Sequence, residues 1–248
     1  LHLNNSTGAY KYVPNDAKIE GLKANATDSF TLRVTDGGGA TASQALSIAI
    51  TGANDTPTLT ASLTAAAYTD TAADNSFADV TGTLASTDRD SNESATFSVT
   101  EQTALTSSNA MAGFTHQKVG SFGTLYLNNS TGAYKYVPND SAIEGLKTNQ
   151  NESFTLTVTD GSGAIASQTL AIAITGANDT PTLRASVTSA PYVDTAADDS
   201  FADVEGTLSS TDRDSGDSKT FSIDNGVLST ATGFTHQQVG EYGTLYLN

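Results

Sequence analysis

The sequence predicts an all-β protein built from tandem β-sandwiches. Three observations lead to this prediction. Long segments of the chain recur in the same order, apolar residues within the recurring unit alternate with polar ones, and clusters of turn-forming residues separate these runs. Together they indicate many short strands packed in two layers within each repeat.

The repeat is visible when the chain is compared with itself. LHLNNSTGAYKYVPNDAKIEGLK at residues 1–23 returns as LYLNNSTGAYKYVPNDSAIEGLK at residues 125–147, 124 residues further on. Towards the C-terminus the spacing falls to 120, so a loop between Glu101 and Ala112 tolerates a change of length. A period of this size is typical of an independent domain. We expect the C-terminal part of one repeat in residues 1–53, a complete repeat in 54–177 and the N-terminal part of the next in 178–248.

Within the complete repeat, apolar residues recur at every second position. The runs FTLTVTD and LAIAIT alternate in this way, and the turn-forming cluster NSTG lies between GTLYLN and AYKYVP, as in a hairpin. Ser141 and Glu144 have the spacing of a capping box, which predicts a single helical turn over 140–146. Strands are expected near residues 58–64, 80–86, 95–100, 115–119, 122–128, 132–138, 153–159 and 168–175.

The composition limits the partners of the chain. With 27 acidic against 11 basic residues, the 248-residue chain carries a net charge of −16. This charge argues against nucleic acid and against electrostatic docking on anionic lipid. No segment approaches the roughly 20 apolar residues of a membrane helix, and the absence of cysteine excludes disulfides and thiolate metal sites. The excess of carboxylates suits a cation as partner. The chain opens inside a repeat, so we expect it to be a piece of a longer protein.

Each predicted boundary carries the segment ITGANDTPTL. Asn, Asp and Pro favour turns, so the segment could be only a turn. Asp88 and Asp90, however, lie two residues apart and project from one face of an extended segment. At about 7 Å and an effective dielectric near 20 they would repel by about 2 kcal/mol, which a bound cation would relieve. Gly52 leaves the linker free on one side and Pro57 stiffens it on the other, so we expect a linker that is hinged without metal.

The residues also carry a family resemblance. VTDGGGATASQALSIAITGANDTPTL resembles the closing segment of a cadherin repeat, GTLASTDRDSNESATFSV resembles the segment with its Asp-x-Asp pair, and LYLNNSTGAYKYVPND resembles its Thr-Gly hairpin. The whole repeat is similar to the VCBS repeat, a cadherin-like module of giant secreted bacterial adhesins of the RTX type. The resemblance implies tandem cadherin-like, immunoglobulin-like Greek-key β-sandwiches joined by short linkers, with Ca²⁺ bound where consecutive domains meet.

Carried over by position, the resemblance implies calcium ligands in the linker, in the Asp-x-Asp pair, in an aspartate turn and at an acidic position early in the domain. Asp140 and Glu144 are the nearest counterparts of the cadherin Asp-Arg-Glu element, which has no clean match, so one or two ions per junction are expected. The implied ligands are Asn54, Asp55, Asp88, Asp90, Asp160 and Asp70, with Asn178, Asp179, Asp212, Asp214, Asp36 and Asp194 as further members in equivalent positions.

We therefore expect a structural extender, the stalk of a secreted, biofilm-associated adhesin on a bacterial surface, whose partners are the neighbouring repeats of the chain. Near-identity of successive units favours this function, because length is gained by copying. The alternative is a module that binds a glycan or protein ligand. An enzyme is not expected, since the chain has no Gly-x-Ser-x-Gly elbow and no phosphate-binding glycine loop. His116 occurs once per repeat without a second metal-binding side chain nearby.

The end segments of this chain complement each other and predict self-association. Residues 1–53 and 178–248 would each expose half of an apolar core and open sheet edges, which favour pairing with another chain. The front part of one molecule could be completed by the back part of the next, a head-to-tail contact that propagates. Light scattering is expected to show a mass that rises with concentration. A compact monomer at every concentration, with protected amides in both end segments, would contradict this expectation.

Overall fold

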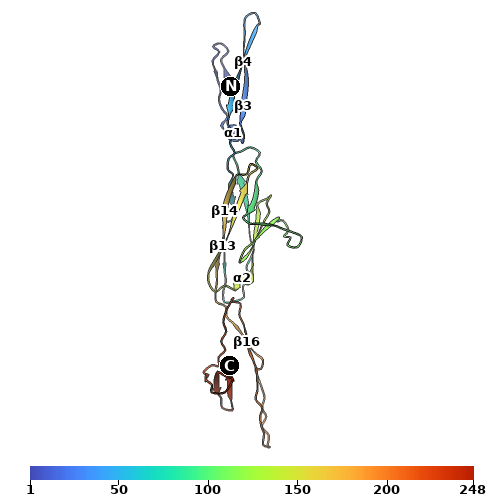
Figure 1. Ribbon diagram of the computed structural model, residues 1–248, viewed down its shortest axis with the longest axis vertical. Coiled ribbons are helices and arrows are strands. Elements are labelled where there is room, and N and C mark those ends of the chain that lie inside the picture. The colour runs from blue at the N-terminus through green and yellow to red at the C-terminus, as the bar shows by residue number, and fades with distance from the viewer. The chain divides into compact units, whose positions relative to one another are not determined.

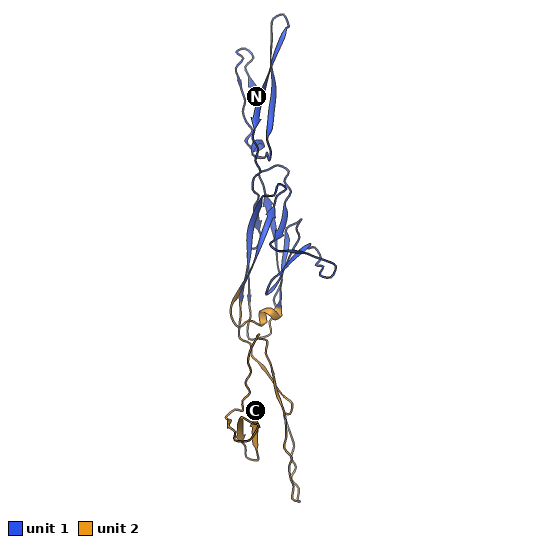
Figure 2. Ribbon diagram, in the orientation of Figure 1, with its two compact units in different colours: residues 1–68, 77–139, 151–174 blue, residues 69–76, 140–150, 175–248 orange.

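The computed structural model describes residues 1–248, and its strands account for 41% of the chain against 4% for helices. The all-β prediction is therefore confirmed. Contacts divide the chain into two units, shown in different colours in Figure 2. Unit 1 comprises residues 1–68, 77–139 and 151–174, and unit 2 comprises residues 69–76, 140–150 and 175–248. Both helices have five residues, and neither has the length or the apolar run needed to cross a bilayer.

Two sheets form the central sandwich. The chain alternates between them, since β5 and β7 belong to one sheet and the intervening β6 to the other. Every strand pair of the larger sheet is antiparallel. In spatial order the larger sheet contains β5 (Thr58–Ala61), β7 (Val80–Thr87), β12 (Ala133–Pro138), β11 (Gly123–Leu127), β10 (His116–Val119) and β9 (Thr103–Ala104). The smaller contains β6 (Ala65–Thr69), β14 (Ile165–Thr175), β13 (Gln150–Thr159) and β8 (Thr96–Val99).

The core lies between the facing surfaces of these sheets. Successive side chains of a strand point to opposite faces, so every second residue of β11 is buried, as are Tyr134 and Tyr136 of β12. Aromatic rings join the layers: the Tyr136 ring on β12 lies 5.7 Å from that of Phe154 on β13 and 6.0 Å from that of Tyr68 on β6. The remaining core residues include Leu84, Phe97, Val99, Leu125, Leu127, Tyr134, Leu156, Val158, Leu170, Ile172 and Ile174.

All eight expected strands are present in the central sandwich, and the expected helical turn is present as α2 (Asp140–Glu144). Two strands were not expected. β6 is rich in alanine, which gives neither a β-branched nor an alternating apolar signal, and β9 has only two residues. The variable loop expected between Glu101 and Ala112 includes the two-residue strand β9 and only part of the segment between β9 and β10.

The flanking segments form smaller sheets from recurring sequence. β3 and β4, both labelled in Figure 1, form a hairpin in which each residue of β3 has a partner on β4. The elements of the first segment are β1 (His2–Leu3), β2 (Tyr10–Lys11), α1 (Asp16–Glu20), β3 (Ala26–Thr35) and β4 (Thr41–Ile50). Those of the last are β15 (Thr182–Ala185), β16 (Leu208–Thr211), β17 (Val227–Leu228), β18 (His236–Val239) and β19 (Thr244–Leu247). The division into domains at 53/54 and 177/178 stays a prediction.

Leu125 and Leu245 provide a matched test of the core, because they hold the same place in the repeat. Leu125 is fully buried on β11, whereas Leu245 is 61% exposed on β19. Leu125→Ala should lower the free energy of unfolding by about 2–5 kcal/mol, since it leaves a cavity between the sheets. Leu245→Ala should change it by less than about 0.5 kcal/mol. Equal effects in urea unfolding would contradict this placement of the core.

Candidate metal centres

The first candidate centre contains Asn54, Asp55, Asp88, Asp90 and Asp160, all within unit 1. The Asn54 side-chain amide donates to Asp160 Oδ2 at 2.9 Å and to the main-chain oxygen of Asp55 at 2.9 Å. The main-chain N–H of Asp55 donates to Asp90 Oδ2 at 2.6 Å. The linker that follows β4 is thereby tied to the loop after β7 and to the turn after β13.

The Asp88–Asp90 pair folds back on itself. The N–H of Asp90 donates to Asp88 Oδ1 at 2.9 Å, the local bond that Asp side chains commonly make two residues on. This arrangement leaves Asp88 Oδ2 and Asp90 Oδ1 buried without a hydrogen-bond partner. The pair therefore presents two uncompensated carboxylate oxygens inside the centre.

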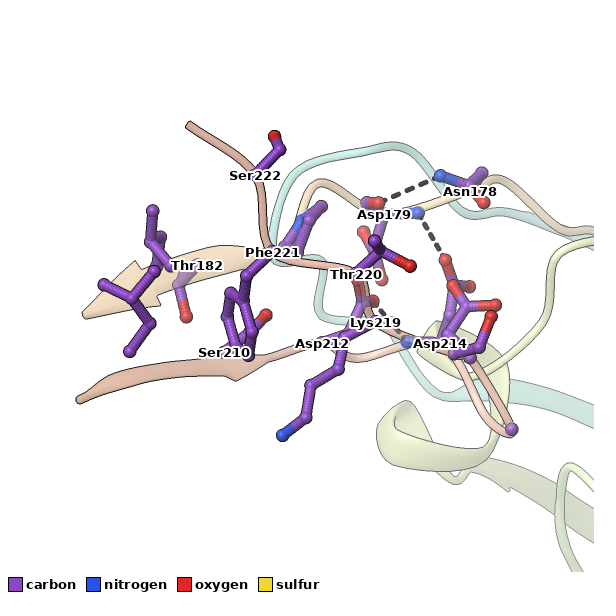
Figure 3. Close-up of a pocket in the computed structure, with 16 residues that line it drawn as sticks. Asn178, Asp179, Thr182, Ser210, Asp212, Asp214, Lys219, Thr220, Phe221 and Ser222 are labelled. Atoms are coloured by element: carbon purple, nitrogen blue, oxygen red, sulfur yellow. Dashed lines mark hydrogen bonds between the residues drawn. The ribbon is translucent and has the colours of Figure 1, made fainter. Parts of the chain in front are cut away.

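The second centre repeats this pattern within unit 2, as Figure 3 shows. The Asn178 amide donates to the main-chain oxygen of Asp179 at 3.0 Å, and the N–H of Asp179 donates to Asp214 Oδ2 at 2.7 Å. The N–H of Asp214 donates to Asp212 Oδ1 at 2.9 Å. Carboxylate oxygens of Asp212, Asp214 and Asp217 lie within 4.8 Å of one another, beside a hollow of about 700 Å³.

Asp70 and Glu144 complete the second centre. Asp70 follows β6; its N–H donates to Thr175 O at 2.9 Å, and its Oδ2 accepts the N–H of Ala177 at 3.2 Å. Glu144 ends α2, and its Oε1 accepts the N–H of Asn75 at 3.0 Å. Burial raises the pKa of the Glu144 carboxyl above its ordinary value, and the nearby Asp70 carboxyl adds to the rise. Asp70 Oδ1 and Glu144 Oε2 are buried without a hydrogen-bond partner.

Two of the sequence-predicted residues, Asp36 and Asp194, lie outside both centres. Asp36 is exposed, and its Oδ1 accepts the N–H groups of Gly38 and Ala40 at 2.9 and 2.8 Å in the turn after β3. Its counterpart Asp160 makes the same turn but also accepts the bond from Asn54, which lowers the pKa of the Asp160 carboxyl. Asp194 is exposed in a segment without a strand. Their part in a metal site stays a prediction.

Sequence reasoning named Glu144 only as a counterpart of the cadherin Asp-Arg-Glu element, without a clean match, and missed three basic residues at the centres. Lys23 Nζ lies 2.7 Å from Glu93 Oε1, and the equivalent pair Lys147 and Asp217 also forms an ion pair. Arg213 contacts two carboxylates of the second centre, on Asp179 and Glu144. A signal was available, because the EGLK and TDRDS segments that carry these residues recur in both copies.

Gly52 and Gly176, the glycines before each linker, lie close to main-chain atoms of their own repeat. A Cβ on Gly52 would overlap the main-chain oxygens of Leu22 and Ala24. A Cβ on Gly176 would overlap those of Leu146 and Thr148. The chain requires glycine here because two backbone segments approach too closely for any side chain. The glycine therefore packs the linker against its own repeat.

The donor set of both centres fits a hard divalent cation. Calcium takes six to eight oxygen ligands, chiefly carboxylate and carbonyl oxygens. A buried carboxylate oxygen without a donor is costly unless a positive charge compensates it. Four such oxygens lie in the two centres: Asp88 Oδ2, Asp90 Oδ1, Asp70 Oδ1 and Asp214 Oδ1. A fifth, Glu144 Oε2, has no hydrogen-bond partner but lies 3.1 Å from Arg213 Nε.

Comparison with known proteins defines the class of the central sandwich. Residues 54–176, slightly under half of the chain, match the family model of the bacterial cadherin-like domain. This segment, which contains the sandwich described above, is therefore similar to the bacterial cadherin-like domain. Such domains are extracellular and non-enzymatic, and cadherin domains bind Ca²⁺ in general. The domain indicates an adhesive or extracellular structural role.

Solved structures of protocadherins are similar at low identity. The PcdhgB3 EC1–4 structure is 14% identical over 89% of this chain and 48% of its own, with a TM-score of 0.35. Protocadherin gamma B2 extracellular cadherin domains 1–5 give 14% identity, 79% and 40% coverage and a TM-score of 0.32. The protocadherin gamma B4 extracellular domain is 17% identical over 95% of this chain and 32% of its own, with a TM-score of 0.35. This chain spans less than half the length of each. A comparison with curated protein sequences gave no match.

Gly176→Ala tests whether the linker is packed or hinged. The added Cβ meets main-chain oxygens of Leu146 and Thr148 that have no rotamer to change, so overpacking should cost about 1–3 kcal/mol of unfolding free energy. Gly243→Ala is the control, because a Cβ there meets nothing within 4 Å. Thermal melting in chelator compares the two variants. A Gly176→Ala protein as stable as the control would contradict this close packing of the linker.

Proposed function

We propose that this chain is part of the stalk of a secreted bacterial surface adhesin, in which serial cadherin-like repeats are stiffened by Ca²⁺ at each junction. The observation that supports the proposal is the set of buried, uncompensated carboxylate oxygens at both linkers. The same linker sequence, the same Asp-Arg-Asp segment and the same main-chain bonds recur at the two centres. A site that is copied with each repeat serves every junction alike.

An ion in these centres would tie together segments that are remote in sequence. At the first centre, Asp88 and Asp90 would supply oxygens beside the linker residues Asn54 and Asp55, with Asp160 bonded to Asn54. One cation there would hold the linker, the loop after β7 and the turn after β13. We expect one or two ions per centre.

At the second centre, Asp70 and Glu144 would face the linker residue Asp179 and the Asp212–Asp214 pair. Removing the ion would leave the carboxylates to repel one another across the linker. The bound state should therefore fix the linker, and the free state should loosen it. The extender function, the location on a bacterial surface and the membership of a VCBS-type adhesin array are parts of this proposal.

Calcium should stabilise the full chain. A ligand at 100 times its Kd adds about 2.7 kcal/mol per site, which corresponds to a rise in melting temperature of roughly 5–10 °C for a protein of this size. Millimolar Ca²⁺ should also increase the maximum dimension in small-angle scattering relative to chelator. Melting curves and scattering profiles that are the same in both conditions would overturn the proposal.

The variant Asp214→Asn sharpens this test, because it removes a buried charge whose Oδ1 has no partner. In chelator the variant should melt at or above the temperature of the parent protein, since an uncompensated buried charge is lost. In Ca²⁺ the order should reverse, since a ligand is missing. Asp90→Asn should do the same at the first centre, and the exposed Asp224→Asn is the control.

A further inference from the structure

The second centre already contains a cation of the protein itself. Arg213 Nε lies 3.1 Å from Asp179 Oδ2 and its Nη2 donates to Asp179 Oδ1 at 2.8 Å, a bidentate pair. Arg213 Nε also lies 3.1 Å from Glu144 Oε2, and its Nη2 donates to the main-chain oxygen of Ala72 at 3.2 Å. Asp179 is 1% exposed, so the guanidinium covers a carboxylate that is almost completely buried.

The equivalent arginine of the first centre is placed differently. The side chain of Arg89 is 70% exposed, and its nitrogens lie 3.6 Å from Glu20 Oε2 and 3.7 Å from Asp55 Oδ1. These are loose surface contacts, which contribute little. The same Asp-Arg-Asp sequence therefore holds its arginine in loose contacts at one centre and in close ion pairs with Asp179 and Glu144 at the other.

We infer that Arg213 is a displaceable counter-ion, which neutralises Asp179 and Glu144 when the second centre is free of metal and must withdraw when calcium binds there. The inference rests on the proposed function, since it concerns the same ion. Both oxygens of Asp179 are occupied by the guanidinium, so a calcium ion at that carboxylate would lie within about 5 Å of a second cation. Two cations at this distance repel appreciably even at an effective dielectric near 20.

The position of Arg89 shows that the Asp-Arg-Asp loop accommodates an outward arginine, so withdrawal needs no change of fold. Arg213 would then weaken calcium binding at its own centre while protecting the metal-free junction from carboxylate repulsion. The arginine sets the calcium concentration at which the second junction changes state.

The test isolates the second centre by disabling the first with Asp90→Asn. Calcium is titrated by calorimetry into the full chain carrying Asp90→Asn alone and together with Arg213→Gln. Removal of the competing cation should tighten calcium binding by about tenfold. In chelator, Arg213→Gln should lower the melting temperature, because Asp179 and Glu144 lose their compensating charge. The conservative Arg213→Lys keeps the charge and should restore weak calcium binding and much of the metal-free stability.

Arg89→Gln, tested with Asp214→Asn in place of Asp90→Asn, is the matched control and should change calcium affinity at the first centre by less than threefold. If the chain with Asp90→Asn alone binds calcium and the addition of Arg213→Gln makes the binding no tighter, the counter-ion inference is wrong and the proposed function stands. If neither the parent chain nor any variant binds calcium, both are wrong. Calcium binding only in Arg213→Gln would support the counter-ion and refute calcium control of the natural second junction.

Discussion

The main-chain N–H of the linker aspartate governs the geometry of both centres. It donates to the second carboxylate of the Asp-Arg-Asp segment, at 2.6 Å from Asp55 to Asp90 and at 2.7 Å from Asp179 to Asp214. Hydrogen bonds to an ionised acceptor are shorter and stronger than neutral ones. Each bond holds one oxygen of the carboxylate and leaves the other buried without a donor. The position of the linker and the inward direction of the charge both follow from it.

Sequence patterns were sufficient wherever the determining interactions are local. Strands with strict alternation, such as β13 and β14, were predictable because their inner faces must be apolar. The linker and Asp-Arg-Asp residues were predictable because short-range hydrogen bonds orient them. Glu144 was not predictable as a buried group, because a helical turn does not reveal which of its sides is covered. The need for glycine at Gly176 comes from a close approach between segments that are almost 30 residues apart, and no local pattern contains it.

Copies of one segment differ in structure because the given sequence contains the partner strands of only one of them. The segment AYKYVP is a strand throughout residues 133–138, where β7 and β11 flank it, but only at Tyr10–Lys11 in its first copy. Tyr134 is 1% exposed and its counterpart Tyr10 is 54% exposed. The contrast between Arg89 and Arg213 has the same origin. Arg213 reaches two acceptors that the second centre supplies close together, the buried Glu144 and the main-chain oxygen of Ala72, whereas the counterpart Glu20 is exposed.

Under the proposed function, the distribution of the acidic residues would allow a tandem array to be lengthened by simple copying. In the central repeat, the residues at one end include Asp55, Asp88 and Asp90, whereas Asp70 and Glu144 belong to the centre that the next linker completes. A repeat therefore contributes a different part of two centres. Duplication of the whole repeat would regenerate a full centre at every new boundary. It would also regenerate the ion pair that Lys23 forms with Glu93 and Lys147 forms with Asp217. A substitution in one repeat would then affect one junction and leave the others unchanged, because each centre draws only on adjacent repeats.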